Sequence, residues 1–244
     1  MPIPKAGDEE VIVKVGASGI CGSDIKCYEG AEILWGGPSP YVKPPVIPGH
    51  EFVGEVVELG ERAAEKTGLE IGDKAVAEQI VPCWECRYCK TGKYWMCQVH
   101  NIFGFQGGVD DGGFAEYMKY PSNAIVHEVP KRMPDERAAF IEPLSCAIHA
   151  VQRARIELGD FVVIAGMGPL GLCMLQVAKL KNPGKLVALD VKENRLRLAE
   201  ELGATLTLNV AREDAVKRVL EMTQGYGCDV YIEASASTSG VTQG

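Results

Sequence analysis

The sequence lacks the features that would place the protein on nucleic acid or in a membrane. Lysine and arginine number 25 against 33 aspartate and glutamate residues, so the net charge is −8, and no basic stripe is present. A protein that binds a phosphate backbone needs the opposite balance. Long uncharged apolar runs are missing too, and the opening MPIPKAGDEE does not resemble a signal peptide. We therefore expect a cytoplasmic protein with neither nucleic acid nor membrane as a partner.

The nine cysteines do not suit a disulfide framework, because their number is odd and no export signal accompanies them. Four of them follow the spacing Cys-x2-Cys-x2-Cys-x7-Cys, which is typical of thiolates that close around a tetrahedral structural zinc. An iron–sulfur cluster would use the same ligand type, but nothing else in the sequence calls for an electron carrier. The four residues are Cys83, Cys86, Cys89 and Cys97.

Two kinds of pattern divide the chain, which at 244 residues is long enough for two ordinary domains. Before residue 135, short strand-like runs alternate with irregular loops. The segment 29–48 is rich in glycine and proline, which indicates a surface loop, and Gly54 is expected to mark a bulge or a close approach. The expected strands of this half cover 11–15, 52–59 and 114–120, and the segment 71–77 is expected to form a turn and a further strand.

From residue 135 onward, apolar strands and amphipathic helices alternate strictly. Such alternation predicts a parallel, doubly wound sheet. The predicted fold is therefore α/β, with a mainly-β domain at 1–135 and a second domain at 136–244 that begins with a linker helix over 136–156. The expected strands of the second domain are 161–165, 185–190, 205–208 and 228–233, and the expected helices are 169–180, 193–202 and 213–223.

A glycine-rich loop follows the first of these strands and opens a helix, which is the context that a dinucleotide-binding fingerprint requires. In the G-x-G-x-x-G pattern, the first glycine permits the turn and the second lets the backbone approach a pyrophosphate. The third allows close packing, and the helix N-terminus attracts the phosphates. The loop residues are Gly166, Gly168, Pro169, Leu170 and Gly171.

Asp190 ends the next strand, 24 residues after Gly166. A carboxylate at that place can accept hydrogen bonds from both ribose hydroxyls and repels a 2′-phosphate, so it favours NAD over NADP. Arg195 is expected either to stack near the adenine or to lie on a solvated helix face.

Three short motifs far apart in the chain offer a thiolate, an imidazole and two carboxylates. They are Gly-Ile-Cys21-Gly-Ser23, Pro-Gly-His50-Glu51 and Ile-Glu142-Pro-Leu. These side chains form a ligand set for one zinc ion with an open position, which is the arrangement of a catalytic rather than a structural site.

These motifs, the four-cysteine segment and Gly-Met-Gly-Pro-Leu-Gly occur in the order typical of zinc-dependent medium-chain alcohol dehydrogenases, and the chain resembles that family over nearly its whole length. Gly-His-Glu together with Glu-Pro-Leu-Ser is similar to the polyol (sorbitol-type) branch. The segment 94–105 resembles bacterial erythritol/threitol dehydrogenases. The resemblance implies a GroES-like catalytic domain followed by a Rossmann domain, with two zinc ions per chain. It also implies hydride transfer from a secondary hydroxyl of a sugar alcohol to NAD+.

The resemblance also implies roles for individual residues. Cys21, His50 and Glu51 would bind the catalytic zinc, and Glu142 would bind it either directly or through a water molecule. Ser23 would take the proton of the substrate hydroxyl, although a serine at this place can also simply cap a turn. Two aromatic residues, Tyr28 and Phe105, are expected either to line the substrate pocket or to pack in the core.

Relatives in this family begin with a further strand pair and continue well beyond residue 244, and they are expected to be homo-oligomers. We therefore expect an incomplete chain that carries the site residues. Two other interpretations remain open. One is an enzyme of the L-threonine 3-dehydrogenase type, which shares Gly-His-Glu, or another zinc alcohol dehydrogenase. The other is an inactive fragment that binds zinc and nucleotide.

Overall fold

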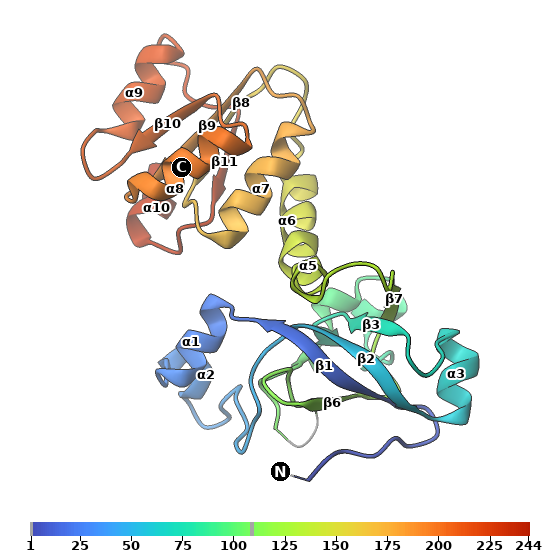
Figure 1. Ribbon diagram of the computed structural model, residues 1–244. Coiled ribbons are helices and arrows are strands. Elements are labelled where there is room, and N and C mark those ends of the chain that lie inside the picture. The colour runs from blue at the N-terminus through green and yellow to red at the C-terminus, as the bar shows by residue number, and fades with distance from the viewer. Residues whose placement is uncertain (1, 108–109) are drawn as a thin grey trace. The chain divides into compact units, whose positions relative to one another are not determined.

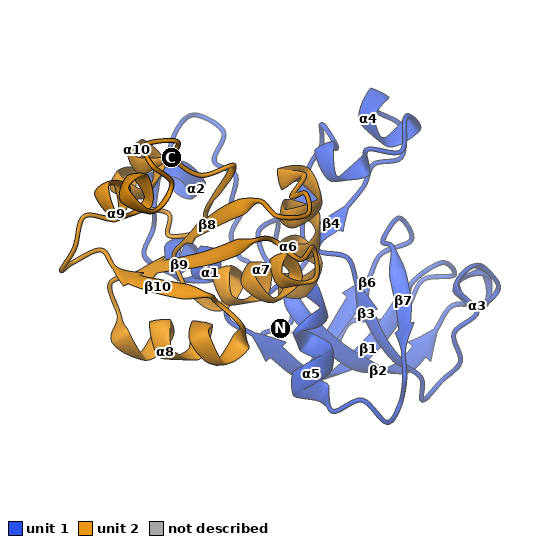
Figure 2. Ribbon diagram, turned by 90° about the horizontal axis from the view of Figure 1, so that it is seen from above, with its two compact units in different colours: residues 1–142 blue, residues 143–244 orange. Residues whose placement is uncertain are grey.

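The computed structural model describes residues 2–107 and 110–244. The chain divides into two compact units, residues 1–142 and 143–244, which Figure 2 colours separately. The domain boundary predicted from the sequence lies after residue 135 and remains a prediction, whereas the two compact units divide after residue 142. No helix in the described part of the chain is both long enough and apolar enough to cross a bilayer.

The first unit is built on a five-stranded antiparallel sheet with the strand order β6-β1-β2-β3-β7 (Figure 1). On its buried face, the ring of Phe52 packs on those of Phe103 and Tyr120, with centroids 5.2 and 5.6 Å away. The alternation seen in the sequence therefore corresponds to a half-buried sheet. The strands are β1 (Val11–Gly19), β2 (Glu51–Leu59), β3 (Lys74–Ala77), β6 (Tyr117–Tyr120) and β7 (Val126–Val129).

The pairing of β1 with β2 confirms the special place of Gly54. A bulge between Val15 and Ala17 lies opposite Gly54. A Cβ atom on Gly54 would stand 2.7 Å from the Cβ of Val13 and 2.8 Å from the carbonyl oxygen of Lys14. A side chain at this position would collide with the neighbouring strand β1, so the close approach of the two strands requires glycine.

The prediction of a plain surface loop over 29–48 is wrong in two respects. A short helix, α2 (Glu32–Trp35), lies within it, and Val42 is fully buried. Val42 packs with Cys27 and Phe105 in a small apolar cluster. The few apolar residues among the glycines and prolines therefore anchor this segment, which its average composition does not reveal.

Short helices and a two-stranded sheet, β4-β5, complete the first unit. The segment predicted as a linker helix consists of two helices, α5 and α6, separated at Phe140. The elements are α1 (Gly22–Tyr28), α3 (Glu61–Thr67), β4 (Ile80–Val81), α4 (Arg87–Lys90), the 3-10 helix η1 (Tyr94–Met96), β5 (Asn101–Ile102) and α5 (Asp135–Ala139). Helix α6 (Ile141–Ala154) begins in the last residues of the first unit and belongs mostly to the second.

The second unit contains the predicted parallel sheet, with the order β10-β9-β8-β11. Alternate residues of β8 enter different cores. Val162 and Ile164 pack against α6 and α7, whereas Val163 and Ala165 pack toward α9. Both faces are therefore covered, as in a doubly wound fold. The elements are β8 (Phe161–Ala165), α7 (Pro169–Lys179), β9 (Lys185–Asp190), α8 (Glu193–Leu202), β10 (Leu206–Asn209), α9 (Ala215–Met222), β11 (Val230–Glu233) and α10 (Thr238–Gln243).

Candidate functional site

The structure brings together three of the four residues expected at the catalytic metal. Cys21, His50 and Glu51 each offer one donor atom, and these atoms lie within 4.8 Å of one another. Cys21 is the N-cap of α1, and Glu51 is the first residue of β2. Glu142 lies in the first turn of α6 and does not belong to this group of described residues.

Strand pairing explains how two of these residues meet. Gly19, at the end of β1, pairs with Glu51 at the start of β2. A Cβ atom on Gly19 would stand 2.2 Å from Oε2 of Glu51, so glycine leaves the space that this carboxylate occupies. Cys21 follows Gly19 by two residues. The register between β1 and β2 therefore places the thiol of Cys21 close to the carboxylate of Glu51.

Asp24 holds the two ligand-bearing segments together. Its Oδ2 accepts a hydrogen bond from the backbone N–H of Cys21 at 2.8 Å, and its Oδ1 accepts one from the N–H of Gly49 at 3.3 Å. Oδ1 also lies 3.4 Å from Nδ1 of His50. With Nδ1 turned to Asp24, Nε2 is the ring nitrogen that can bind a metal, on the side where Oγ of Ser23 lies 3.5 Å away. The role of Asp24 was not predicted from the sequence, although its position three residues after Cys21 is that of a helix-capping carboxylate.

The charges of this cluster favour metal binding. Burial disfavours the imidazolium, but the neighbouring Asp24 carboxylate and Cys21 sulfur outweigh it and raise the pKa of His50 to about 10. The hydrogen bond with His50 lowers the pKa of the Cys21 thiol. Burial raises the pKa of Glu51. One sulfur, one nitrogen and one oxygen donor form a set that suits zinc, and a metal ion would displace the proton from the imidazole.

Three glycines fix the backbone that carries His50. Gly49 has φ 96°, which disfavours other residues. A Cβ atom on Gly104 would stand 2.8 Å from the nitrogen of Gly49, and one on Gly112 would stand 2.2 Å from its oxygen. The ring of Phe105 lies 5.7 Å from that of His50. The glycine-rich character of this part of the sequence is thus explained by close packing around the ligand segment.

The remaining candidates of this region lie in different surroundings. Ser23 is near the cluster, with its Oγ 3.5 Å from Nε2 of His50. Phe105 is 4% exposed and belongs to the apolar cluster with Val42, whereas Tyr28 is 93% exposed at the end of α1. Of the two aromatic candidates, Phe105 therefore packs in the core beside the site.

The four-cysteine segment forms a second cluster, with all four sulfur atoms within 4.8 Å of one another. Backbone amides point at the sulfurs: the N–H of Cys83 donates to Sγ of Cys97 at 3.4 Å, and the N–H of Cys86 donates to Sγ of Cys83 at 3.4 Å. Backbone hydrogen bonds lower the pKa of Cys86 to about 6, while burial raises that of Cys89 to about 12. Convergent sulfurs with amide donors suit a tetrahedral metal without an open position.

In the second unit, the glycine loop has the geometry of a phosphate cradle. Gly166 has φ 93°, and a Cβ atom on Gly171 would stand 1.8 Å from the oxygen of Gly166. A Cβ atom on Gly168, by contrast, would meet nothing within 4 Å. Gly168 is the N-cap of α7, Pro169 is its first residue, and Leu170 follows. The space at Gly168, in front of a helix N-terminus, is what a diphosphate requires.

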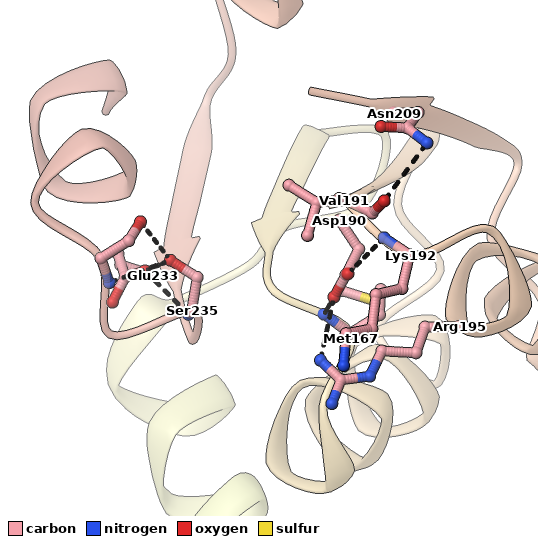
Figure 3. Close-up of polar contacts among 9 residues, drawn as sticks. Met167, Asp190, Val191, Lys192, Arg195, Asn209, Glu233 and Ser235 are labelled. Carbon is pink, nitrogen blue, oxygen red and sulfur yellow. Dashed lines mark hydrogen bonds and ion pairs between the residues drawn. The ribbon is translucent and has the colours of Figure 1, made fainter. Parts of the chain in front are cut away.

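Asp190 joins the end of β9 to this loop (Figure 3). Its Oδ2 accepts a hydrogen bond from the N–H of Met167 at 2.7 Å, and its Oδ1 accepts one from the N–H of Lys192 at 2.8 Å. Nη1 of Arg195 lies 3.6 Å from Oδ2. In this structure Arg195 therefore contacts Asp190, a role that neither sequence interpretation included.

Asn209, at the end of β10, is a residue that the sequence analysis did not name. Its Nδ2 donates to the carbonyl oxygen of Val191 at 3.4 Å and to Oε1 of Glu193 at 2.5 Å. These bonds tie down the turn that follows Asp190 (Figure 3). A polar residue directly after a parallel strand was the available signal.

Comparisons with known proteins agree with these sites. Residues 7–131 match the family described as "Alcohol dehydrogenase GroES-like domain", and residues 169–244 match "Zinc-binding dehydrogenase". The chain is 50% identical to an erythritol/L-threitol dehydrogenase of Mycolicibacterium smegmatis, covering 99% of this chain and 67% of that protein. It is 38% identical to an L-threonine 3-dehydrogenase of Caldanaerobacter subterraneus, covering 99% and 66%.

Solved structures show the same fold. A putative zinc-binding dehydrogenase from Sinorhizobium meliloti, bound to NADP, superposes with a TM-score of 0.86 at 34% identity, covering 99% of this chain and 67% of that one. The chain thus spans about two thirds of the length of these relatives. The predicted GroES-like and Rossmann architecture is confirmed, and the chain belongs to the zinc-dependent medium-chain alcohol dehydrogenase family.

Proposed function

We propose that the protein transfers a hydride from the secondary hydroxyl-bearing carbon of a sugar alcohol to NAD+, with a four-carbon polyol such as erythritol or threitol as substrate. The observation that carries the proposal is the cluster of Cys21, His50 and Glu51, whose donor atoms lie within 4.8 Å. The substrate class follows from the 50% identity to an erythritol/L-threitol dehydrogenase.

The donor set assigns the metal-binding roles. Sγ of Cys21, Nε2 of His50 and a carboxylate oxygen of Glu51 would hold one zinc ion, with Glu142 completing the set directly or through water. When bound, the ion supplies Lewis acidity, which lowers the pKa of a substrate hydroxyl toward neutrality. Asp24 keeps the imidazole oriented through Nδ1. A second zinc ion in the four-cysteine cluster would be structural.

Ser23 is suited to move the proton that the substrate hydroxyl loses. Its Oγ lies 3.5 Å from Nε2 of His50, the nitrogen proposed to bind the metal. A hydroxyl can accept a proton on one lone pair while it donates its own, which is what a relay requires.

Asp190 supports NAD as the cofactor. Oδ1 accepts one backbone N–H and has a second lone pair for a ribose hydroxyl, whereas Oδ2 accepts another N–H and also lies 3.6 Å from Nη1 of Arg195. The charge of the carboxylate opposes a 2′-phosphate. The neighbouring Arg195 is the feature that favours NADP, so the two nucleotides must be compared directly.

An enzyme of the L-threonine 3-dehydrogenase type is the second candidate, because a relative with that activity is 38% identical. A protein that binds zinc and nucleotide without turnover is the third, because the two clusters of metal-binding side chains and the glycine loop do not by themselves require catalysis.

A substrate panel and a metal assay separate the three. The zinc-loaded chain is incubated with NAD+ or NADP+ and with erythritol, D- and L-threitol, sorbitol or L-threonine, and reduced nucleotide is measured. We expect turnover with NAD+ and a tetritol, and two zinc ions per chain. Turnover of L-threonine alone would establish the second candidate. Two zinc ions with no turnover of any substrate would establish the third.

A further inference from the structure

In the second unit, the loops that follow two neighbouring strands touch each other. Gly166 follows β8, and Ser235 follows β11, which pairs with β8 in parallel so that Glu233 lies opposite Ala165. A Cβ atom on Gly166 would stand 2.5 Å from the nitrogen of Ser235. The first glycine of the fingerprint is therefore required by the loop after β11 as well as by its own backbone angle.

One carboxylate organises the loop after β11. Oε1 of Glu233 accepts a hydrogen bond from the N–H of Ser235 at 2.7 Å and another from its hydroxyl, and Oε2 accepts one from the N–H of Ala236 at 3.2 Å (Figure 3). Oγ of Ser235 in turn accepts a hydrogen bond from the N–H of Ser237 at 3.2 Å. Burial opposes the charge of Glu233, but these hydrogen bonds outweigh it and lower its pKa.

The opposite side of this loop is closed by α10. Oγ of Ser237 caps that helix by accepting a hydrogen bond from the N–H of Gly240 at 3.0 Å. A Cβ atom on Gly240 would stand 2.7 Å both from Oε1 of Glu233 and from Oγ of Ser235. The loop is thus held between two glycines, Gly166 and Gly240, and has little room to shift.

The place of this loop in the sheet indicates what it faces. All four strands are parallel. The chain adds β9 and β10 on one side of β8 and then returns to add β11 on the other side, so the order of the strands reverses between β8 and β11. Dinucleotides bind across the carboxyl ends of the strands at such a point. With the adenosine ribose at Asp190 and the diphosphate at Gly168, the other half of the dinucleotide extends toward β11.

We propose that Glu233 is a positioning residue for the dinucleotide: its carboxylate fixes Ser235 against Gly166 and so shapes the wall along which the nicotinamide half binds. The inference rests on the proposed dehydrogenase function, and it adds a residue that acts on only one half of the cofactor. Each of these two carboxylates, Asp190 and Glu233, fixes the loop at the end of its own strand (Figure 3). Asp190 would then serve the adenosine half of the dinucleotide, and Glu233 the nicotinamide half.

Binding measurements on the zinc-loaded chain test this division. The titrants are NADH and AMP, and AMP represents the adenosine half alone. Glu233→Gln replaces one acceptor oxygen by an NH2 group, so one backbone N–H of the loop loses its partner. We expect the Kd for NADH to rise about tenfold, while the Kd for AMP stays unchanged. Glu221→Gln on the exposed face of α9 is the matched control and should change neither value.

The alternatives give different results. A Glu233→Gln variant that binds NADH like the unaltered chain would overturn the proposal. Equal weakening for NADH and AMP would also overturn it, because a general loss of structure affects both halves. If Glu233→Gln fails to fold, Glu233→Asp is measured in the same way, since it keeps the charge but shortens the reach. If the unaltered chain binds neither NADH nor AMP, the proposed function itself fails.

Discussion

Oδ1 of Asp24 lies 3.4 Å from Nδ1 of His50, and both side chains are only 4% exposed. The same carboxylate accepts hydrogen bonds from the N–H groups of Cys21 and Gly49. One buried carboxylate therefore links the start of helix α1, which carries the thiol of Cys21, to the segment just before strand β2, which carries the imidazole of His50. Its removal leaves two backbone amides without an acceptor and takes the negative charge away from the buried imidazole.

Asp24→Asn should lower the affinity of the catalytic zinc by about 10- to 100-fold, as for other partners of metal-bound histidines. The amide keeps the shape of the side chain but loses the charge that orients the ring. Zinc affinity can be measured by competition with a chelator. Asp8→Asn, at an exposed acid paired with Arg62, is the control. Unchanged zinc affinity in Asp24→Asn would show that the ring is held by packing alone.

Cys89→Ser should remove the structural zinc and lower the stability of the chain. Cys89 is buried, and its sulfur lies 3.5 Å from that of Cys86. Since the metal binds the folded state only, its loss removes the whole binding free energy from stability. Zinc content should fall from two ions to one, and the melting temperature should fall with it. Cys228→Ser is the control, because Cys228 lies in the second unit; the same loss of zinc there would contradict the assignment.

The sequence predicts a helix or strand well where the residues that determine it are close together in the chain. The parallel unit was predicted closely: the strands 161–165 and 185–190 and the helix 193–202 agree with the structure residue for residue. These boundaries depend on residues close in sequence: each strand is a continuous apolar run, and Gly203 ends helix α8. In the first unit, helix α3 (Glu61–Thr67) and strand β7 were not predicted, since both are short and depend on packing against distant strands.

The site shows the same division. Residue types and spacing named Cys21, His50 and Glu51, and the structure brings their donor atoms together. The roles of Asp24 and Glu233 were not predicted, because each acts by hydrogen bonds to backbone N–H groups, which exist only once the turns are formed. A carboxylate in a sequence gives no sign that it faces amides rather than solvent.

Two of the three glycines of the dinucleotide loop, Gly168 and Gly171, should respond differently to alanine. Gly168→Ala should leave stability unchanged, because its Cβ meets nothing within 4 Å, but it should weaken NADH binding by filling the cradle. Gly171→Ala should destabilise the unit by about 1–3 kcal/mol, the usual cost of overpacking, because its Cβ would stand 1.8 Å from the oxygen of Gly166. Thermal melting and NADH titration separate the two effects. Gly168→Ala with undiminished NADH affinity would show that no diphosphate approaches that point.

Asp110 gives a prediction about pH. It is 2% exposed, its Oδ2 has no hydrogen-bond partner among the described residues, and burial raises its pKa to about 6. The unfolded state releases this proton near the ordinary pKa of about 4. Between those values the unfolded state holds fewer protons than the folded state, so this residue lowers stability as pH rises from 4 to about 6, and the loss is constant above that.

Asp110→Asn removes the charge and keeps the shape, so it should stabilise the chain at neutral pH. The gain should be at most about 3 kcal/mol, should shrink as pH falls below 6 and should be nearly absent at pH 4. Urea unfolding of both proteins across this pH range measures it, with Asp8→Asn as the exposed control. A difference that does not depend on pH would mean that the amide changes packing rather than charge. A gain that grows between pH 4 and about 6 and stays constant above that therefore identifies the ionised carboxylate of Asp110 as the destabilising group.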